Sequence, residues 1–328
     1  MTELSLYQAF ILSIGSLLIG IVMLVRGGGM TIDSSVFIAK RFGISPMLIG
    51  FTVLAFGTSF PELVISILAN MQDSAGIALG NVLGSNIANI FLVLAVTALF
   101  VPMTIHIDKA IRRDMVAMIL ATCLLMFFMY VGVISRAAGL LFVALIFAYI
   151  YIQYRLSKVE NLPFEIEDPG FKDPKKAYAY VFLGLILIAA GAEFLVQGAQ
   201  VTAELLRVPE DIIGLSIIAL GTSLPELSTS IIAGRKGHTD MVVGNIIGSN
   251  VFNILMIIGI TSIIKPIYTA TFSPQLVEFD MWVALIVAIT FCIIAFLFGK
   301  IGKITASLFI VSYLAYNIFI YASNISTM

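Results

Sequence analysis

The chain has 328 residues, of which 60% are hydrophobic and only 11% are charged. Soluble domains carry about 25% charged residues, so this composition indicates an integral membrane protein and excludes a soluble domain. The net charge of −1 argues against a nucleic-acid partner, because nucleic-acid-binding surfaces are strongly basic. The two cysteines, Cys123 and Cys292, both lie in apolar runs, where we expect buried thiols rather than a disulfide.

The first apolar run, Leu4 to Val25, holds 22 residues without a charge. That length crosses a hydrocarbon core of about 30 Å, and no basic segment precedes it, so we expect a first span rather than a signal peptide. Nine further long runs follow, and their unbroken apolar character excludes the alternating strands of a β-barrel. The ten predicted spans lie near residues 4–26, 44–70, 75–100, 115–134, 137–154, 178–200, 212–233, 241–264, 281–299 and 304–324.

The positive charges indicate how these spans are oriented. Lys and Arg are enriched in cytoplasmic loops. If the N-terminus is outside, only Arg136, Arg207 and Lys265 fall on the outer side, and the other 15 of the 18 Lys and Arg residues fall on the inner side. This split supports ten spans with both termini outside the cell membrane.

The two halves of the chain share one long repeat. Residues 50–102 and 214–266 align without a gap at an offset of 164 residues, with 20 identities in 53 positions. Each half has five predicted spans, an odd number, so the second copy must enter the membrane inverted relative to the first. The sequence therefore predicts an all-α membrane protein of ten transmembrane helices in two inverted five-helix repeats. These repeats are residues 1–155 and 177–328, and residues 156–176 form a cytoplasmic connector between them.

Two glutamates lie deepest in apolar sequence. An acidic residue at the centre of a membrane helix costs about 2.5–3.5 kcal/mol, and two neighbouring carboxylates also repel each other unless a cation joins them. On a helix, residues three or four apart share a face, so each glutamate gains hydroxyl neighbours, and each second motif aligns a serine with an asparagine. These groups are Thr58, Ser59 and Glu62; Thr222, Ser223 and Glu226; Ser85 and Asn89; and Ser249 and Asn253.

Backbone oxygens add to this set. Pro61 and Pro225 have no N–H, so the helical carbonyls of Gly57 and Gly221 lose their partners and local unwinding is favoured. The result is an all-oxygen site, and Ca²⁺ prefers about 6–8 oxygen ligands in flexible geometry. The two histidines, His106 and His238, both fall in predicted loops, so nothing favours zinc or copper.

Other small polar residues in the repeat have a structural interpretation. We expect the four motif glycines, Gly80, Gly84, Gly244 and Gly248, to serve close helix packing. For Asn81, Asn86, Asn245 and Asn250 the sequence leaves hydrogen bonding between helices and contact with an ion equally open. Glu193, a third acid, is expected at the membrane interface rather than in the site.

At these motifs the chain resembles a known family. GTSFPE with GNVLGSNIAN, repeated as GTSLPE with GNIIGSNVFN, is similar to the paired alpha-repeats of sodium/calcium exchangers, within the calcium:cation antiporter superfamily. The resemblance implies that spans 2, 3, 7 and 8 form four cation sites and that spans 1 and 6 slide across the rest during alternating access. The metal ligands that it implies are Ala55 (through its carbonyl), Thr58, Ser59, Glu62, Ser85, Asn89, Ala219, Thr222, Ser223, Glu226, Ser249 and Asn253.

The resemblance implies a secondary antiporter that exchanges Ca²⁺ for Na⁺, with no enzymatic activity and no cofactor besides the transported ions. Its partners would be these ions and the lipid bilayer, and a monomer would suffice, although the oligomeric state stays open. Two departures matter. Asn253 stands where potassium-dependent relatives carry Asp, and the central loop is too short for a regulatory domain. A proton-coupled exchanger of the same fold is the alternative, a cation channel is a weaker one, and a membrane hydrolase lacks a His or Cys cluster.

The predicted orientation can be tested with single cysteines. We expect Asp73, just after span 2, to be external, and Lys236, at the matching place after span 7, to be cytoplasmic. In a background with Cys123 and Cys292 replaced, an impermeant thiol reagent applied to intact cells should label Asp73→Cys and leave Lys236→Cys unlabelled. Permeabilised cells, in which both should react, are the control. Labelling of both from one side would mean parallel repeats.

Overall fold

The computed structural model describes residues 6–43, 45–159, 174–205, 223–268 and 274–326. The chain is almost entirely helical, which confirms the all-α prediction, and it adds two short ribbons of two strands each. The first half contains α1 Leu6–Phe42, α2 Pro46–Ile49, η1 Gly50–Leu54, α3 Ala55–Thr58, α4 Phe60–Met71, α5 Ala75–Ala88, η2 Asn89–Leu94, α6 Ala95–Phe100, β1 Met103–Thr104, α7 Lys109–Val131, β2 Val133–Ile134 and α8 Arg136–Val159. The second half contains α9 Pro174–Leu205, α12 Leu224–Arg235, α13 Thr239–Phe252, η4 Asn253–Ile258, α14 Gly259–Ile264, β3 Ile267–Tyr268, η6 Leu276–Asp280, α15 Met281–Phe298, β4 Lys300–Ile301 and α16 Lys303–Ser326.

In the described ranges, eight helices are long and apolar enough to cross a membrane, and a ninth span results if the bent pair 47–58 and 60–71 is counted as one. The predicted span 212–233 begins outside the described residues, and only its second part, α12, is seen. Ten spans therefore stay a prediction. Two helices are longer than predicted: α1 continues past Arg26 to Phe42, where Gly43 ends it in the left-handed conformation (φ 60°), and α9 extends the span predicted for 178–200 at both ends.

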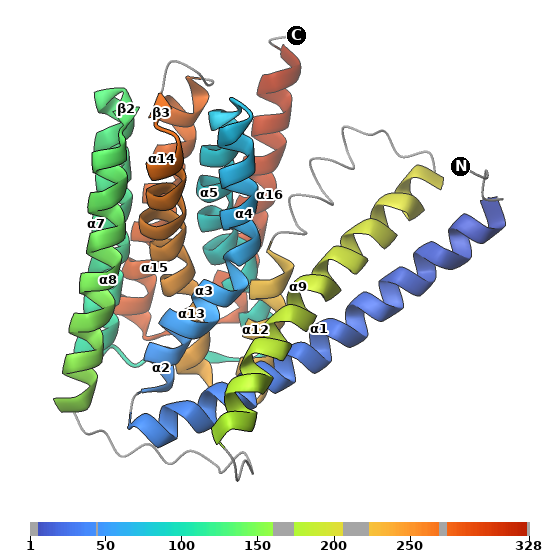
Figure 1. The fold of residues 1–328 in the computed structure, drawn as a ribbon, viewed down its shortest axis with the longest axis horizontal. Helices are drawn as coiled ribbons and strands as arrows, with labels where there is room; N and C mark the ends of the chain where they lie inside the picture. Colours follow the sequence, from blue (N-terminus) through green and yellow to red (C-terminus); the bar gives the residue numbers. More distant parts are fainter. Residues whose placement is uncertain (1–5, 44, 160–173, 206–222, 269–273, 327–328) are drawn as a thin grey trace.

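Helices α1 and α9 form an antiparallel pair that leans away from the other helices (Figure 1). Glycines at the crossing let the two backbones touch. A methyl group on Gly20 would lie 2.7 Å from the carbonyl oxygen of Gly191, and one on Gly27 would lie 2.7 Å from that of Gly184. Small residues allow such close packing in membranes, where lipid removes the hydrophobic driving force between helices. Gly20 and Gly184, like Gly27 and Gly191, are 164 positions apart.

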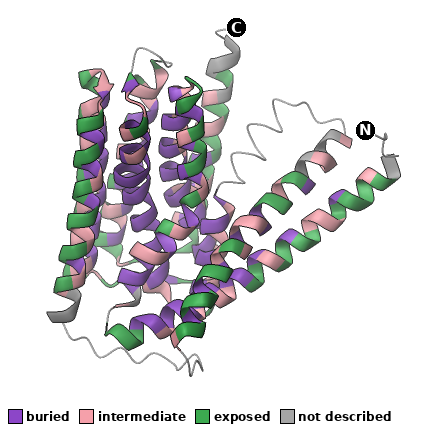
Figure 2. Cartoon of the chain, in the orientation of Figure 1, coloured by how far each residue is buried: buried purple, intermediate pink, exposed green. Residues whose placement is uncertain are grey.

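The remaining helices form a bundle whose centre is α13 with its continuations η4 and α14. Residues 241–258 are all buried, as the purple core of Figure 2 shows. Close packing is confirmed at Gly244 and Gly248, because a methyl group on either would collide with the backbone of the α2–η1 segment. Gly80 and Gly84 differ: no described atom outside their own helix comes closer than 3.9 Å to a methyl group placed there. Close packing is thus not seen for this second pair of glycines within the described ranges.

Both ends of the bundle are joined by antiparallel ribbons between the halves. Strand β1 pairs with β4, so that Met103 lies opposite Ile301. Strand β2 pairs with β3, so that Ile134 lies opposite Ile267. Each ribbon takes one strand from the first half of the chain and one from the second, so the two halves are fastened to each other outside the helical core.

The glycine crossing predicts a position-specific effect in α1. Gly27→Ala should destabilise the protein by about 1–3 kcal/mol, because the added methyl group has to displace the backbone of α9. Gly29→Ala, two residues along the same helix, is the matched control, because no described atom lies within 4 Å of its methyl group. Thermal unfolding of the purified proteins in detergent would show a lower midpoint for Gly27→Ala alone. Equal midpoints for the two variants would contradict this packing.

Candidate cation site

The site begins at a break between helices α3 and α4. Ser59 separates them with φ −87° and ψ 8°, and the two helical segments differ in direction by 44°. Pro61 lies in the first turn of α4, where its missing N–H needs no partner. The predicted break is therefore confirmed in the first half. Ser223 has nearly the same backbone conformation (φ −90°, ψ 0°) directly before α12.

Glu62 and Glu226 lie in the first turns of α4 and α12, and only 1% and 2% of their surfaces are exposed. A helix N-terminus carries partial positive charge, which stabilises a carboxylate there. Ser59 donates a hydrogen bond of 3.0 Å from its hydroxyl to Glu226 Oε1, so the break of one half contacts the acid of the other. Ser59 directly precedes the helix that carries Glu62, so this bond brings the two acidic helix ends together. The two glutamates therefore lie at one buried centre between the halves, which is where the repeat placed them.

Two π-helical segments adjoin this centre. Segment η2 begins at Asn89 and η4 begins at Asn253, again 164 positions apart. A π-helical turn holds one more residue than an α-helical turn, and such turns are often found at functional sites. The order of apolar and polar side chains does not reveal this extra residue, so the two π-helical turns were not predicted.

The motif asparagines form reciprocal hydrogen bonds between the two halves. Asn89 donates from Nδ2 to Asn250 Oδ1 at 3.2 Å, and Asn253 donates from Nδ2 to Asn86 Oδ1 at 3.0 Å. Asn86 in turn donates from Nδ2 to the carbonyl oxygen of Asn250 at 3.2 Å. Asn86 and Asn250 therefore join helices of the two halves. They also contact Asn253 and Asn89, the two asparagines that were predicted as ligands.

The other two motif asparagines bind within their own halves. Asn81 donates to the Ser66 hydroxyl at 3.0 Å and to the carbonyl of Glu62 at 3.1 Å. Asn245 donates to the Ser230 hydroxyl at 3.5 Å. These bonds connect adjacent helices of one half, which supports the structural interpretation for Asn81. Asn245 also has a buried Oδ1 without a partner among the described residues, so both interpretations remain for it.

Ten of the twelve predicted ligands lie within the described ranges, and all ten are buried. Ala219 and Thr222 lie outside those ranges. Thr58 donates its hydroxyl to the carbonyl of Leu54, and the carbonyl of Ala55 accepts a 3.0 Å bond from the Ser59 amide. Glu193 is exposed on α9, away from this set, and both histidines lie outside the helices, as predicted.

Several oxygens of this set have no protein partner. In the part of the chain that the structure describes, eight side-chain oxygens are buried without a hydrogen bond, and half of them belong to predicted ligands. An unsatisfied buried polar atom costs about 1–3 kcal/mol, so such atoms are rare without a reason. The four oxygens are Glu62 Oε2, Glu226 Oε2, Ser249 Oγ and Asn253 Oδ1.

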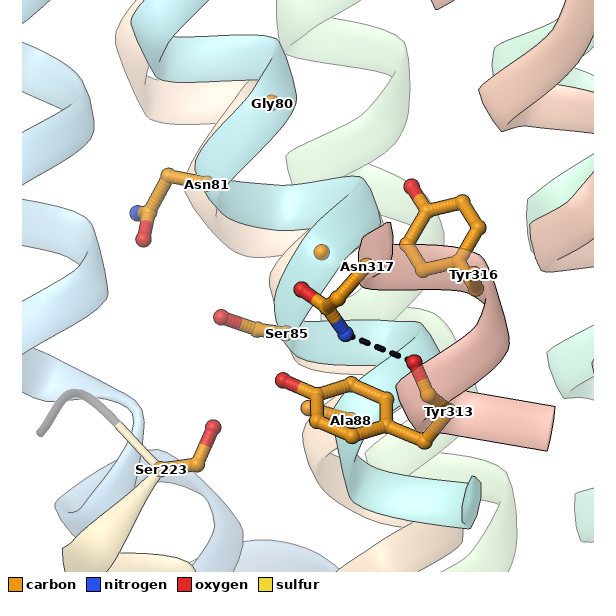
Figure 3. A pocket seen from close by; sticks show the side chains of 9 residues that line it. Gly80, Asn81, Ser85, Ala88, Ser223, Tyr313, Tyr316 and Asn317 are labelled. Atoms are coloured by element: carbon orange, nitrogen blue, oxygen red, sulfur yellow. Dashed lines mark hydrogen bonds between the residues drawn. The ribbon is translucent and has the colours of Figure 1, made fainter. Parts of the chain in front are cut away.

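A cavity of about 130 Å³ adjoins the predicted ligands (Figure 3). The hydroxyls of Ser85 and Ser223 face it from one side. The opposite wall comes from α16, where Asn317 donates to the carbonyl of Tyr313 at 2.8 Å. Sequence analysis assigned no role to α16. The signal was present, since the polar wall residues Tyr313, Tyr316 and Asn317 follow helical spacing on one face.

Two further buried acids were also missed. Asp114 on α7 accepts hydrogen bonds from Tyr149 and Gln153 of α8. Asp280 at the end of η6 accepts a 3.0 Å bond from the hydroxyl of Tyr316. Helices α8 and α16 begin at an offset of 167 residues, which also relates the two tyrosines. Each acid directly precedes a predicted span, and that placement was the signal that could have identified it.

Comparisons with known proteins agree with this geometry. A family model described as sodium/calcium exchanger protein matches residues 12–155 and 176–322. The inner membrane protein YrbG of Escherichia coli is 34% identical over 292 residues, covering 87% of this chain and 89% of the relative. The sodium/calcium exchanger MaX1 of Methanosarcina acetivorans is 33% identical over 299 residues, covering 78% and 84%.

The fold is also similar to that of a solved exchanger. The sodium-calcium exchanger NCX_Mj, soaked with Na⁺ and Sr²⁺, has a TM-score of 0.79 and 30% identity, over 93% of this chain and 97% of that chain. The family model covers most of the chain, the long relatives exceed 30% identity, and the apolar helices suit a bilayer. The chain is an integral membrane transporter that belongs to the sodium/calcium exchanger family.

Proposed function

We propose that this protein is a secondary active antiporter that exchanges Ca²⁺ for Na⁺ by alternating access. The transported ions would bind at the junction of the two halves. The ligands would be the ten buried residues already described, together with Ala219 and Thr222. The site takes groups from both halves of one chain, so a monomer suffices, and both termini would lie outside the cell membrane.

The observation that carries this proposal is the set of buried, unpaired oxygens. Glu62 and Glu226 each bury a carboxylate oxygen that has no hydrogen-bond donor among the described residues, and Ser249 and Asn253 add neutral oxygens. Two buried carboxylates at adjoining helix ends need a compensating positive charge. A divalent cation surrounded by oxygens supplies it, and Ca²⁺ prefers this kind of ligand.

Repeated contacts support two inverted repeats, residues 1–155 and 177–328, with residues 156–176 as a cytoplasmic connector. The bond from Asn89 to Asn250 has its counterpart in the bond from Asn253 to Asn86 at an offset of 164. The glycine contacts between the antiparallel helices α1 and α9 repeat at the same offset. A two-fold axis in the membrane plane would exchange these contacts, and such an axis relates the repeats of many transporters. Ten spans would complete the arrangement.

Sodium coupling fits the balance of charged and neutral oxygens. Two carboxylates match the charge of one Ca²⁺, whereas several Na⁺ ions would have to share them and use neutral oxygens as well. The buried hydroxyls of Ser59, Ser85 and Ser223 are available for this role. Proton coupling is the second candidate, because the two glutamates would then carry protons in exchange for calcium. In that case the neutral oxygens would not be needed as ligands for Na⁺.

Transport measurements distinguish these couplings. Proteoliposomes loaded with Na⁺ and diluted into Na⁺-free buffer with radioactive Ca²⁺ should accumulate calcium. An imposed proton or potassium gradient alone should produce no uptake. Empty liposomes are the control. Uptake driven by protons without sodium would replace the proposed coupling, and sustained single-channel currents would indicate a channel instead.

The paired carboxylates give a second test. Glu62→Gln and Glu226→Gln should each lower calcium uptake at least about tenfold, because removing one charge leaves the cation poorly compensated in a buried site. Glu193→Gln is the matched control, since that carboxylate is exposed on α9 and bonded to Gln197. Uptake would be normalised to the amount of folded protein in the membrane. Near-normal exchange by either site variant would remove that glutamate from the ligand set.

A further inference from the structure

We propose that Asn86 and Asn250 are positioning residues: each holds the amide of a cation ligand from the opposite half so that its oxygen faces the cation. The two ligands are Asn253 and Asn89. This inference rests on the proposed function, in which these asparagines bind the transported ions. It assigns roles to two residues for which the sequence left packing and ion contact equally open.

The orientation of the side-chain amides follows from one hydrogen bond whose acceptor is a backbone carbonyl. The carbonyl oxygen of Asn250 can only accept a hydrogen bond, so the group of Asn86 that lies 3.2 Å away must be its Nδ2. The Oδ1 of Asn86 then points to the other side, where Asn253 lies 3.0 Å away. An oxygen there requires a donor, so Asn253 has to present its Nδ2. Its own Oδ1 is consequently left buried and without a partner.

The other half repeats the bond between the side chains. Asn250 Oδ1 accepts from Asn89 Nδ2 at 3.2 Å, and among the described residues Asn250 Nδ2 donates to the Met118 sulfur, at 3.5 Å. A thioether is a weak acceptor, so the bond to Asn89 is the stronger of the two. Both ligands are thus held by Nδ2, the atom that a cation repels, and in Asn253 the oxygen that a cation attracts has no partner among the described residues.

Fixing an amide in this way matters because its two ends have opposite polarity. Rotation by 180° about the last side-chain torsion would exchange oxygen and nitrogen, and the NH₂ group would then face the positive ion. A hydrogen bond made before the ion arrives removes this alternative and pre-organises the site. The same hydrogen bond also restricts which side chain fits at position 253. An Asp at 253 would place a carboxylate oxygen against Asn86 Oδ1, and Asn86 cannot rotate without losing its bond to the Asn250 carbonyl.

The test compares two substitutions at position 250. Asn250→Asp keeps an oxygen that can accept from Asn89, whereas Asn250→Leu has a similar size and no acceptor. The loss of one hydrogen bond corresponds to about tenfold in affinity. We therefore expect Asn250→Leu to weaken Ca²⁺ binding about tenfold and Asn250→Asp to weaken it less. If Asn250 only packed helices, the order would be reversed, because burying an added charge is worse than burying Leu.

The negative charge that Asn250→Asp adds can itself attract a cation. Asn250→Leu is therefore also measured in an Asn89→Leu background. No amide remains to be oriented there, and Asn250→Leu should cause no further loss of affinity. A full additional loss would overturn the proposal, because the two effects would then be independent. Asn70→Leu is the matched control: Asn70 is 2% exposed, as Asn250 is, and its amide donates to the backbone carbonyls of Thr261 and Lys265, which are not predicted ligands.

Binding is measured as stabilisation of the purified protein by added Ca²⁺ and, in parallel, as the calcium dependence of uptake. If Asn250→Leu does not fold, Asn86→Leu tests the same proposal through Asn253. Wild-type affinity in Asn250→Leu, with the wild type binding and exchanging calcium, would overturn this inference alone. Failure of the wild type to bind or exchange calcium would overturn the proposed function, and the inference with it.

Discussion

The rest of the structure is organised around two carboxylates buried among apolar helices. Glu62 and Glu226 are each placed at the start of a helix, where the partial positive charge of the helix end lowers the cost of burial. That placement requires the helices to begin in the middle of the bundle, and the Ser-x-Pro sequences, Ser59 to Pro61 and Ser223 to Pro225, supply the two starts. Broken helices at this depth persist where protein encloses the break or where it lines a polar cavity, and α13 with η4 covers this centre with residues that are all buried from 241 to 258.

The polar residues around this centre fall into three groups according to their hydrogen-bond partners. Some hydroxyls and amides bind the backbone or a neighbouring helix within their own half, as Thr58 and Asn81 do. Others cross between halves, as Ser59 and Asn86 do. A third group retains an oxygen without any donor. Residue type alone does not separate these groups, because an asparagine occurs in each of them.

Local chemistry and the repeat itself were readable from the sequence, whereas the individual hydrogen bonds between the two halves were not. The break at Ser59 was predictable because Pro61 lacks an N–H whatever surrounds it. The shared face of Ser59 and Glu62 followed from helical spacing in the same way. The pairing of Asn86 with Asn253 depends on how two helices from different halves cross, which no local pattern encodes. Gly84 and Gly248 occupy the same motif position but have different surroundings, so one interpretation could not fit both.

The two ribbons have a consequence for how the protein is made. Strand β1 finds its partner β4 about two hundred positions later in the chain, and neither ribbon can form from one half alone. Contacts of such high sequence separation form late, after the segments between them have been synthesised. During synthesis the helices of the first half therefore wait in the bilayer with both of their ribbon strands unpaired and with a buried acid unmatched. Completion of the last hairpin, α15 to α16, closes the β1–β4 ribbon, so assembly of the site is coupled to the end of translation.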